Sequence, residues 1–355
     1  MKILFIVPYP VRQAPSQRFR FEQYLPLLTD HSNQIQIRPF LQTKNWKLFY
    51  KKGHTLRKTF FLIRGFIDRL LSLFTVSAYD LIFIHREATP IGPPFFEWFV
   101  ARVFKKKIIY DFDDALWITD RKDEPKAIRW LKWRSKIKFV CRWSHVVSCG
   151  NAYLKSYASM YNSSVVVNPT TIDTQQINEE IIKKDHTKIT IGWTGTHSTL
   201  KYLHEKEPVL LQIQKKYPTI EFVFISDIKP EFDGVRFTFK QWNLENEIDD
   251  LVSIDIGTMP LPDDAWTRGK CGFKALQFMA LGIPCVVSPV GVNSKIVDHG
   301  VNGFLATSDA EWITSLSYLI ENKSLRNSMG VSGQEKIHSH FSVSSNSKNF
   351  LSLFS

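Results

Sequence analysis

The segment from Arg268 to Ala306 constrains the fold more than any other part of this chain. A glycine at 272 precedes a short run with apolar residues on one side, and Gly282-Ile283-Pro284 ends that run. Glycine tolerates the positive φ of a helix end, and proline cannot continue a helix. A short apolar run, 285–288, follows at once and indicates a buried strand. This order of helix, stop and buried strand is typical of an α/β sheet protein.

The same alternation of strand-like and helix-like runs recurs in both halves of the chain. Helix-like stretches such as 18–28 and 205–217 separate apolar runs that are typical of parallel strands buried on both faces. A break near 168–173 divides the chain, whose 355 residues suffice for two domains with separate cores. We therefore predict two Rossmann-like α/β domains, 1–172 and 173–335. The predicted strands are 2–7, 79–85, 107–112, 145–149, 189–193, 221–225, 254–257 and 285–288.

Several classes of protein are excluded or disfavoured by simple patterns. No run of about eighteen apolar residues predicts a transmembrane helix, since the longest candidate, 60–76, contains Arg64, Asp68 and Arg69. The four cysteines have no CxxC or zinc-ligand spacing, which favours a reducing compartment. No GxGxxG follows the first strand, so an NAD-dependent dehydrogenase is disfavoured. We expect a cytoplasmic protein.

The net charge of +12 is concentrated in the first half. Residues 1–172 hold 28 Lys and Arg against 12 Asp and Glu, a balance of +16, whereas the remaining 18 basic and 22 acidic residues give −4. Aromatic residues are interleaved with this charge, a pattern typical of segments that lie on anionic membrane surfaces. A solvated basic face remains the alternative, and no nucleic-acid-binding signature is present. The basic clusters are Lys44, Lys47, Lys51, Lys52, Arg57, Lys58, Arg64 and Arg69, and the segment 121–142.

Two glycine-containing turns in the second half favour phosphate binding. Lys270 and Lys274 flank Gly272, where the N–H groups that open the helix favour an anion. The predicted strand at 189–193 runs into a loop at Gly195 and Thr196, the position where doubly wound domains bind phosphate.

Residues 277–287 (QFMALGIPCVV) and 296–305 (IVDHGVNGFL) resemble the C-terminal signature of glycosyltransferase family 4, the "glycosyl transferases group 1" enzymes. The resemblance implies the GT-B fold, in which two Rossmann-like doubly wound domains face a central cleft. It also implies an acceptor-binding first domain, a sugar-nucleotide-binding second domain, and a C-terminal helix, 336–355, that crosses back to the first. Retention of anomeric configuration and no requirement for a metal follow from the same resemblance.

The resemblance also implies donor-binding residues, with departures from the family pattern. Gly195 and Lys201 match a Gly-Arg and Lys that hold the donor diphosphate, but Thr196 replaces the arginine. Lys270 or Lys274 is expected to supply the missing charge, beside the amides near Gly272 and Phe273. Gln277 replaces the second of two family glutamates and keeps an acceptor oxygen for the ribose hydroxyls, while Gly269 replaces the first.

Candidate residues in the first half follow the ends of predicted strands. Asp113 and Asp114 occupy the positions of a family His-Asp pair and are the predicted catalytic residues, with helix caps and loop ion pairs as the alternative. A metal site at these carboxylates is rejected because the rest of the chain resembles GT-B enzymes. The predicted acceptor-binding residues are Ser16, Arg18, Arg20 and His85.

The function predicted from the sequence is transfer of a sugar from a nucleotide-sugar donor to a glycan or lipid-linked acceptor. We expect this in the biosynthesis of cell-surface polysaccharide or lipopolysaccharide, by a cytoplasmic enzyme that binds peripherally to the membrane. Two alternatives remain, a sugar-nucleotide epimerase of the same fold and a non-catalytic sugar-nucleotide- or glycan-binding subunit. No cofactor, metal or nucleic acid is expected.

Overall fold

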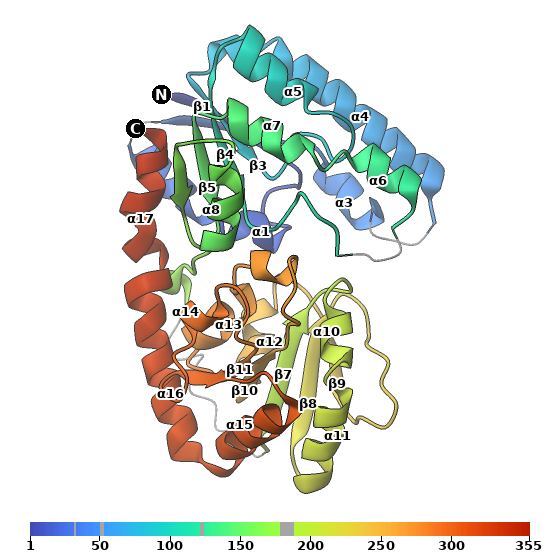
Figure 1. Ribbon diagram of the computed structural model, residues 1–355, viewed down its shortest axis with the longest axis vertical. Coiled ribbons are helices and arrows are strands. Elements are labelled where there is room, and N and C mark those ends of the chain that lie inside the picture. Colours follow the sequence, from blue (N-terminus) through green and yellow to red (C-terminus); the bar gives the residue numbers. More distant parts are fainter. Residues whose placement is uncertain (32, 50–52, 121–123, 178–187) are drawn as a thin grey trace. The chain divides into compact units, whose positions relative to one another are not determined.

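The computed structural model describes residues 1–31, 33–49, 53–120, 124–177 and 188–355. They form two compact units (Figure 1). Unit 1 comprises Met1–Thr170 together with Asn346–Ser355, and unit 2 comprises Thr171–Ser345. Of the basic residues noted above, Lys51, Lys52 and Arg121 lie outside the described residues.

Unit 1 is built on a parallel sheet of six strands in the order β2-β1-β3-β4-β5-β6. The strand order reverses between β1 and β3, and ligands of doubly wound sheets bind outside the carboxyl ends of strands at such a point. The loops after β1 and β3 therefore hold the candidate site of this unit. The strands are β1 (Lys2–Val7), β2 (Gln34–Pro39), β3 (Leu81–His85), β4 (Lys107–Phe112), β5 (Val146–Cys149) and β6 (Val165–Val167).

The helices of unit 1 differ from the sequence prediction near the N-terminus. The single helix expected over 18–28 is instead three short pieces, one physical reason being that Pro26 has no N–H with which to continue a helix from the preceding turn. The helical elements are α1 (Pro15–Arg18), η1 (Glu22–Tyr24), α2 (Leu25–Asp30), α3 (Thr43–Phe49), α4 (Thr55–Leu73), η2 (Val76–Ala78), α5 (Phe95–Trp98), η3 (Phe99–Val103), α6 (Lys126–Lys132), α7 (Lys136–Trp143) and α8 (Ala152–Ser159).

Unit 2 repeats the architecture with a parallel sheet in the order β12-β11-β10-β7-β8-β9. Its strand order reverses between β7 and β10, which places the loop after β7 where a ligand site is expected. The strands are β7 (Thr190–Gly195), β8 (Glu221–Ser226), β9 (Thr238–Gln241), β10 (Ile256–Met259), β11 (Cys285–Val287) and β12 (Gly303–Leu305).

The helix-stop-strand segment of unit 2 forms as its sequence predicts. Helix α13 (Phe273–Ala280) ends before Gly282, which has φ +69°, and β11 follows. The expected helix over 205–217 is α11 (Glu207–Lys216). The other helical elements are η4 (Thr174–Gln176), α10 (Leu200–His204), α12 (Glu247–Leu251), η5 (Thr267–Gly269), α14 (Asn293–Ile296), α15 (Asp309–Glu321), α16 (Lys323–Lys336) and η6 (Ile337–Phe341).

The C-terminal residues complete the core of unit 1. Helix α17 (Val343–Leu351) carries Phe350 and the turn η7 (Ser352–Phe354) carries Phe354, and both buried rings pack on elements of the first half. The ring of Phe350 stacks on Tyr24 with centroids 4.2 Å apart, and Phe354 stacks on Phe83 at 6.0 Å. The last ten residues therefore belong to unit 1.

We expect Phe350→Ala to destabilise unit 1 by about 3–5 kcal/mol, because it removes a buried ring and leaves a cavity beside Tyr24. Denaturant unfolding measures the change. Met160→Ala is the matched control, since Met160 is exposed in the same unit and its truncation should change stability by about 0.5 kcal/mol or less. A loss no larger than that of the control would contradict the role of Phe350.

Candidate functional site

The loop after β7 in unit 2 is shaped around a buried tryptophan. Trp193 lies in the core, and a Cβ on Gly195 would approach its ring to 2.4 Å, so only glycine fits there. The backbone N–H of Thr199 donates to the carbonyl of Thr196 at 2.8 Å, and the N–H of Thr196 donates to Oγ1 of Thr199 at 3.2 Å. These bonds hold the loop in a closed turn at the strand end.

Lys274 joins this loop to the first turn of α13. Its Nζ donates to Oγ1 of Thr199 at 3.3 Å and lies 4.7 Å from the centroid of the Trp193 ring. Two elements separated by 75 residues, both predicted to bind phosphate, therefore meet at one ammonium group. Burial, together with the positive charge of Lys270, lowers the pKa of Lys274 to about 7.

The N-terminus of α13 has the properties of an anion site. Gly272 has φ +69°, and a Cβ there would lie 2.2 Å from Cδ1 of Ile296, so this turn requires glycine. No side chain caps the helix, and its first turn carries no acidic residue. Phe273 begins the helix and is partly exposed. The positive end of the helix dipole therefore adds to the charge of Lys274.

The remaining predicted donor residues lie at different distances from this ammonium group. Lys270 is partly buried, with its Nζ 4.7 Å from the Trp266 ring, and it is close enough to Lys274 to lower that pKa. Lys201 is exposed on α10 with its Nζ 5.0 Å from the Tyr202 ring. Gln277 is buried on α13.

A buried ion pair organises the strand ends of unit 1. The carboxylate of Asp111, at the end of β4, accepts from the guanidinium of Arg20 and from the Ser148 hydroxyl at 2.6 Å, and its Oδ2 lies 2.9 Å from Nδ1 of His85. Arg20 also donates to the carbonyl of Asn168. Burial alone would raise the pKa of Asp111, but Arg20 and His85 hold that pKa well below its usual range.

This cluster corrects two predictions for acceptor binding. Arg20 and His85 are completely buried, so neither side chain reaches a ligand in solution in this structure. Arg20 follows the four-residue helix α1 and points into the core, where Asp111 supplies its counter-charge. Ser16 and Arg18, the other predicted acceptor residues, lie in α1 and are partly exposed.

Arg86 follows His85 at the end of a predicted strand, but it is not among the catalytic and binding residues predicted from the sequence. Its Nη1 donates to Asp113 at 2.7 Å and to Asp114 at 2.8 Å. Burial would lower the pKa of Arg86, but these two carboxylates hold it well above its ordinary value. Its φ of +60° is held by hydrogen bonds from its N–H to the carbonyl of Asp111 and from the Tyr110 hydroxyl to its own carbonyl. The sequence did contain a signal for this role of Arg86. Asp113 and Asp114 are adjacent carboxylates, and such a pair needs a positively charged partner nearby.

The described residues show neither a metal-ligand cluster nor a membrane-spanning helix. No group of three or more His, Cys, Asp or Glu side chains in that part of the chain is arranged to hold a metal ion. None of the helices formed by those residues combines the length and apolarity needed to cross a bilayer.

Comparison with known proteins identifies the relatives of this fold. Residues 188–322 match the family model described as "Glycosyl transferases group 1". No curated protein sequence matches this chain. Among solved structures, sucrose-phosphate synthase of Thermosynechococcus elongatus has a TM-score of 0.72 at 12% identity, over 99% of this chain and 98% of that chain.

Two further structures share the whole architecture. HepE of Anabaena, in complex with UDP and glucose, has a TM-score of 0.66 at 15% identity and full coverage of both chains. A glycosyltransferase of Rickettsia africae has a TM-score of 0.66 at 12% identity, over 99% of this chain and 97% of that chain. The family match and the shared fold confirm the predicted resemblance and the predicted GT-B class.

We expect Asp111→Asn to destabilise unit 1 by about 3–5 kcal/mol, because the substitution leaves the Arg20 guanidinium buried without its counter-ion. Denaturant unfolding at neutral pH measures the loss. The control is Asp263→Asn, which breaks an exposed pair with Arg268 and should cost about 1 kcal/mol or less. Equal losses in the two variants would show that the buried pair has no special role.

Proposed function

We propose that this chain, a glycosyltransferase related to the group 1 enzymes, transfers a sugar from a nucleotide-sugar donor to a glycan or lipid-linked acceptor. The observation that carries the proposal is the contact of Lys274 with Thr199 and Trp193 inside the segment that matches the family. That contact brings a partly buried cation, a helix N-terminus and the loop after β7 to one place. A diphosphate is the ligand whose charge and size suit all three.

The chemistry assigned to this site is stabilisation of the leaving group. When the bond between the anomeric carbon and the phosphate oxygen breaks, the electron pair leaves with the nucleoside diphosphate. The acceptor hydroxyl oxygen forms the new bond to the anomeric carbon, and its proton passes to the departing diphosphate. Lys274 and the N–H groups that open α13 would offset the growing negative charge. Lys270 and Lys201 extend the positive surface, and Gly195 and Thr196 supply backbone groups where the family uses an arginine.

Gln277 is proposed to recognise the donor ribose. It lies on α13, the same short helix that carries Lys274, and its amide oxygen can accept a hydroxyl hydrogen bond without a charge. HepE, which has the same fold, binds UDP and glucose, and this supports a nucleotide-sugar donor for the present chain.

Unit 1 is proposed to hold the acceptor. Asp113 and Asp114 are the proposed catalytic residues, and Arg86 is a positioning residue that fixes both carboxylates at the end of β4. Ser16 and Arg18 are the proposed acceptor contacts, because both are partly exposed whereas Arg20 and His85 are completely buried. Retention of anomeric configuration is proposed from the family resemblance. Independence of metals is proposed from the same resemblance, and the lysines and the helix terminus at the donor site support it because they supply positive charge.

The biological setting proposed is assembly of cell-surface polysaccharide or lipopolysaccharide at the cytoplasmic face of the membrane. The excess of +16 in residues 1–172 supports peripheral association with an anionic surface. The four cysteines are buried and free, which is compatible with a reducing compartment.

Donor binding should depend on Lys274 and should take up protons. At pH 8 its pKa of about 7 leaves the amine mostly neutral, and a bound diphosphate favours the charged form, so UDP binding should draw in about one proton. Calorimetry of UDP binding in buffers of different ionisation enthalpy measures this uptake. Lys274→Met should abolish it and weaken UDP binding tenfold or more, an estimate of about 1.5–3 kcal/mol for a charge-assisted hydrogen bond.

Lys215→Met is the matched control, because Lys215 is an exposed lysine of the same unit and should leave both quantities unchanged. Undiminished affinity and uptake in the Lys274→Met protein would contradict the diphosphate assignment.

The isolated chain should produce a glycoside, and product analysis separates the three candidate functions. Gly269 and Gln277 replace the two family glutamates. This observation favours the alternative that the chain is a non-catalytic subunit. We expect incubation with a panel of sugar nucleotides and lipid-linked acceptors to release a nucleoside diphosphate and extend one acceptor. Interconversion of sugar nucleotides without an acceptor would instead identify an epimerase, and binding without turnover would identify the subunit.

A further inference from the structure

Helix α4 turns an apolar face to solvent. Its exposed apolar residues recur every three or four positions and so lie along one side of the helix, with Leu56 88% and Phe74, just past its end, 82% exposed. A surface helix normally shows the reverse arrangement. We call this set the α4 stripe: Leu56, Phe60, Ile63, Ile67, Leu70, Leu71 and Phe74.

The rotation of α4 is fixed by what lies on its buried side. Gly65 is packed so closely that a Cβ would lie 2.7 Å from the ring of Phe40. Arg69 is buried, and its guanidinium donates to the carbonyls of Val7, Ala88 and Arg38 at 2.7–2.9 Å. The helix cannot roll the α4 stripe inward without breaking these bonds. Arg69 is therefore a core residue, which corrects its place in the basic cluster inferred from the sequence.

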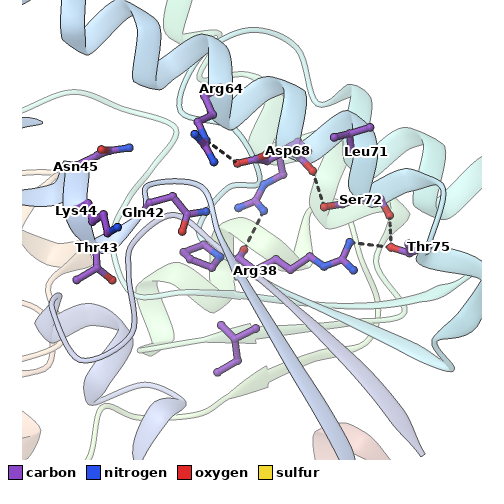
Figure 2. Close-up of a pocket in the computed structure, with 13 residues that line it drawn as sticks. Arg38, Gln42, Thr43, Lys44, Asn45, Arg64, Asp68, Leu71, Ser72 and Thr75 are labelled. Carbon is purple, nitrogen blue, oxygen red and sulfur yellow. Dashed lines mark hydrogen bonds and ion pairs between the residues drawn. The ribbon is translucent and has the colours of Figure 1, made fainter.

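A basic pocket adjoins the α4 stripe. The pocket has a volume of about 900 Å³ and is lined by Arg38, Lys44 and Arg64, among others (Figure 2). Leu71 belongs both to the pocket wall and to the α4 stripe, so the apolar and the basic surfaces are continuous. Arg64 is exposed, and Arg38 donates to the Thr75 hydroxyl at 2.7 Å.

The neighbouring segment adds further exposed apolar surface. Helix α5 packs against α4, and the chain from α5 into η3 exposes Phe95, Trp98, Phe99 and Val103. Trp and Tyr are enriched where protein meets the headgroup layer of a membrane, and Trp98 is such a side chain. The apolar area is thus broader than one helix.

We propose that the α4 stripe docks on an anionic phospholipid bilayer, with α4 lying in the interface and a lipid phosphate entering the pocket of Arg38, Lys44 and Arg64. This deepens the peripheral association proposed above by naming the face and the headgroup chemistry. Apolar residues supply burial among acyl chains, and the flanking cations match the negative surface charge. A second copy of the chain is the less suitable occupant, because pairing two α4 faces would bring Arg57 and Arg64 of both copies together.

Vesicle binding by the full chain tests this proposal. Co-sedimentation should show at least tenfold stronger binding to phosphatidylcholine vesicles containing phosphatidylglycerol than to phosphatidylcholine alone, and salt should weaken it. The double variant Ile63→Asp/Ile67→Asp should lose binding tenfold or more, since it places two carboxylates in the α4 stripe. Lys44→Gln/Arg64→Gln should lose several-fold on anionic vesicles and little on neutral ones.

Three controls test whether a loss of vesicle binding is specific to the α4 stripe. Val331→Asp changes an exposed apolar residue of unit 2 and should bind vesicles as the unaltered protein does. Thermal unfolding establishes that each variant folds, and UDP binding, which depends on unit 2, should be unchanged in all of them. If a protein bound vesicles but did not bind UDP, that result would contradict the proposed function and leave the docking proposal intact.

Two outcomes would overturn the docking proposal. One is full vesicle binding by the Ile63→Asp/Ile67→Asp protein. The other is a concentration-dependent dimer that this variant disrupts, in a protein that ignores anionic vesicles, since that result would assign the α4 stripe to a second copy of the chain.

Discussion

The buried carboxylate of Asp111 is the constraint on which the functional end of unit 1 depends. It binds Arg20 from the segment after β1, His85 from β3 and Ser148 from β5, and Arg20 in turn binds the carbonyl of Asn168. A charge of this kind is tolerated inside a protein only when its partners satisfy it. Once they do, the loops that follow β1, β3 and β4 are fixed relative to one another, and the partly buried pairing of Arg86 with Asp113 and Asp114 is positioned beyond the strand end.

Unit 2 contains a partly buried charge, Lys274, whose surroundings are the opposite of those of Arg20. Lys274 has no carboxylate among the partners that shift its pKa, only burial and a second lysine, and both lower it. A cation held in this manner is stabilised when an anion arrives, whereas the Arg20 guanidinium is already satisfied by Asp111. The contrast separates a structural ion pair from a binding group, and it explains why the family-matched segment is the better candidate for ligand recognition.

The missed strands show where sequence periodicity fails. Eight strands were predicted from apolar runs, and the residues that the structure describes form twelve. The four additional strands, β2, β6, β9 and β12, are the edges of the two sheets. An edge strand is short or half-exposed, so its sequence carries a weaker apolar signal than a strand buried on both faces. For the same reason the central strands were predicted to within about two residues at either end, the range over which element boundaries are ordinarily uncertain.

The sequence by itself determined the central strands and the turn glycines at 272 and 282, because these depend on local backbone requirements and hydrophobic periodicity, and its motif at 277–287 carried the resemblance to group 1 glycosyltransferases. Only the tertiary structure decided what each cation does. Arg20 and Arg69 became core residues, and Lys274 met the loop after β7, through partners that lie from 19 to 148 residues away in the sequence. The pattern of α4 fixed that it is amphipathic, but the packing of Gly65 and Arg69 decided that its apolar side faces outward. Burial and long-range partners set the role of a charge, and local sequence encodes neither.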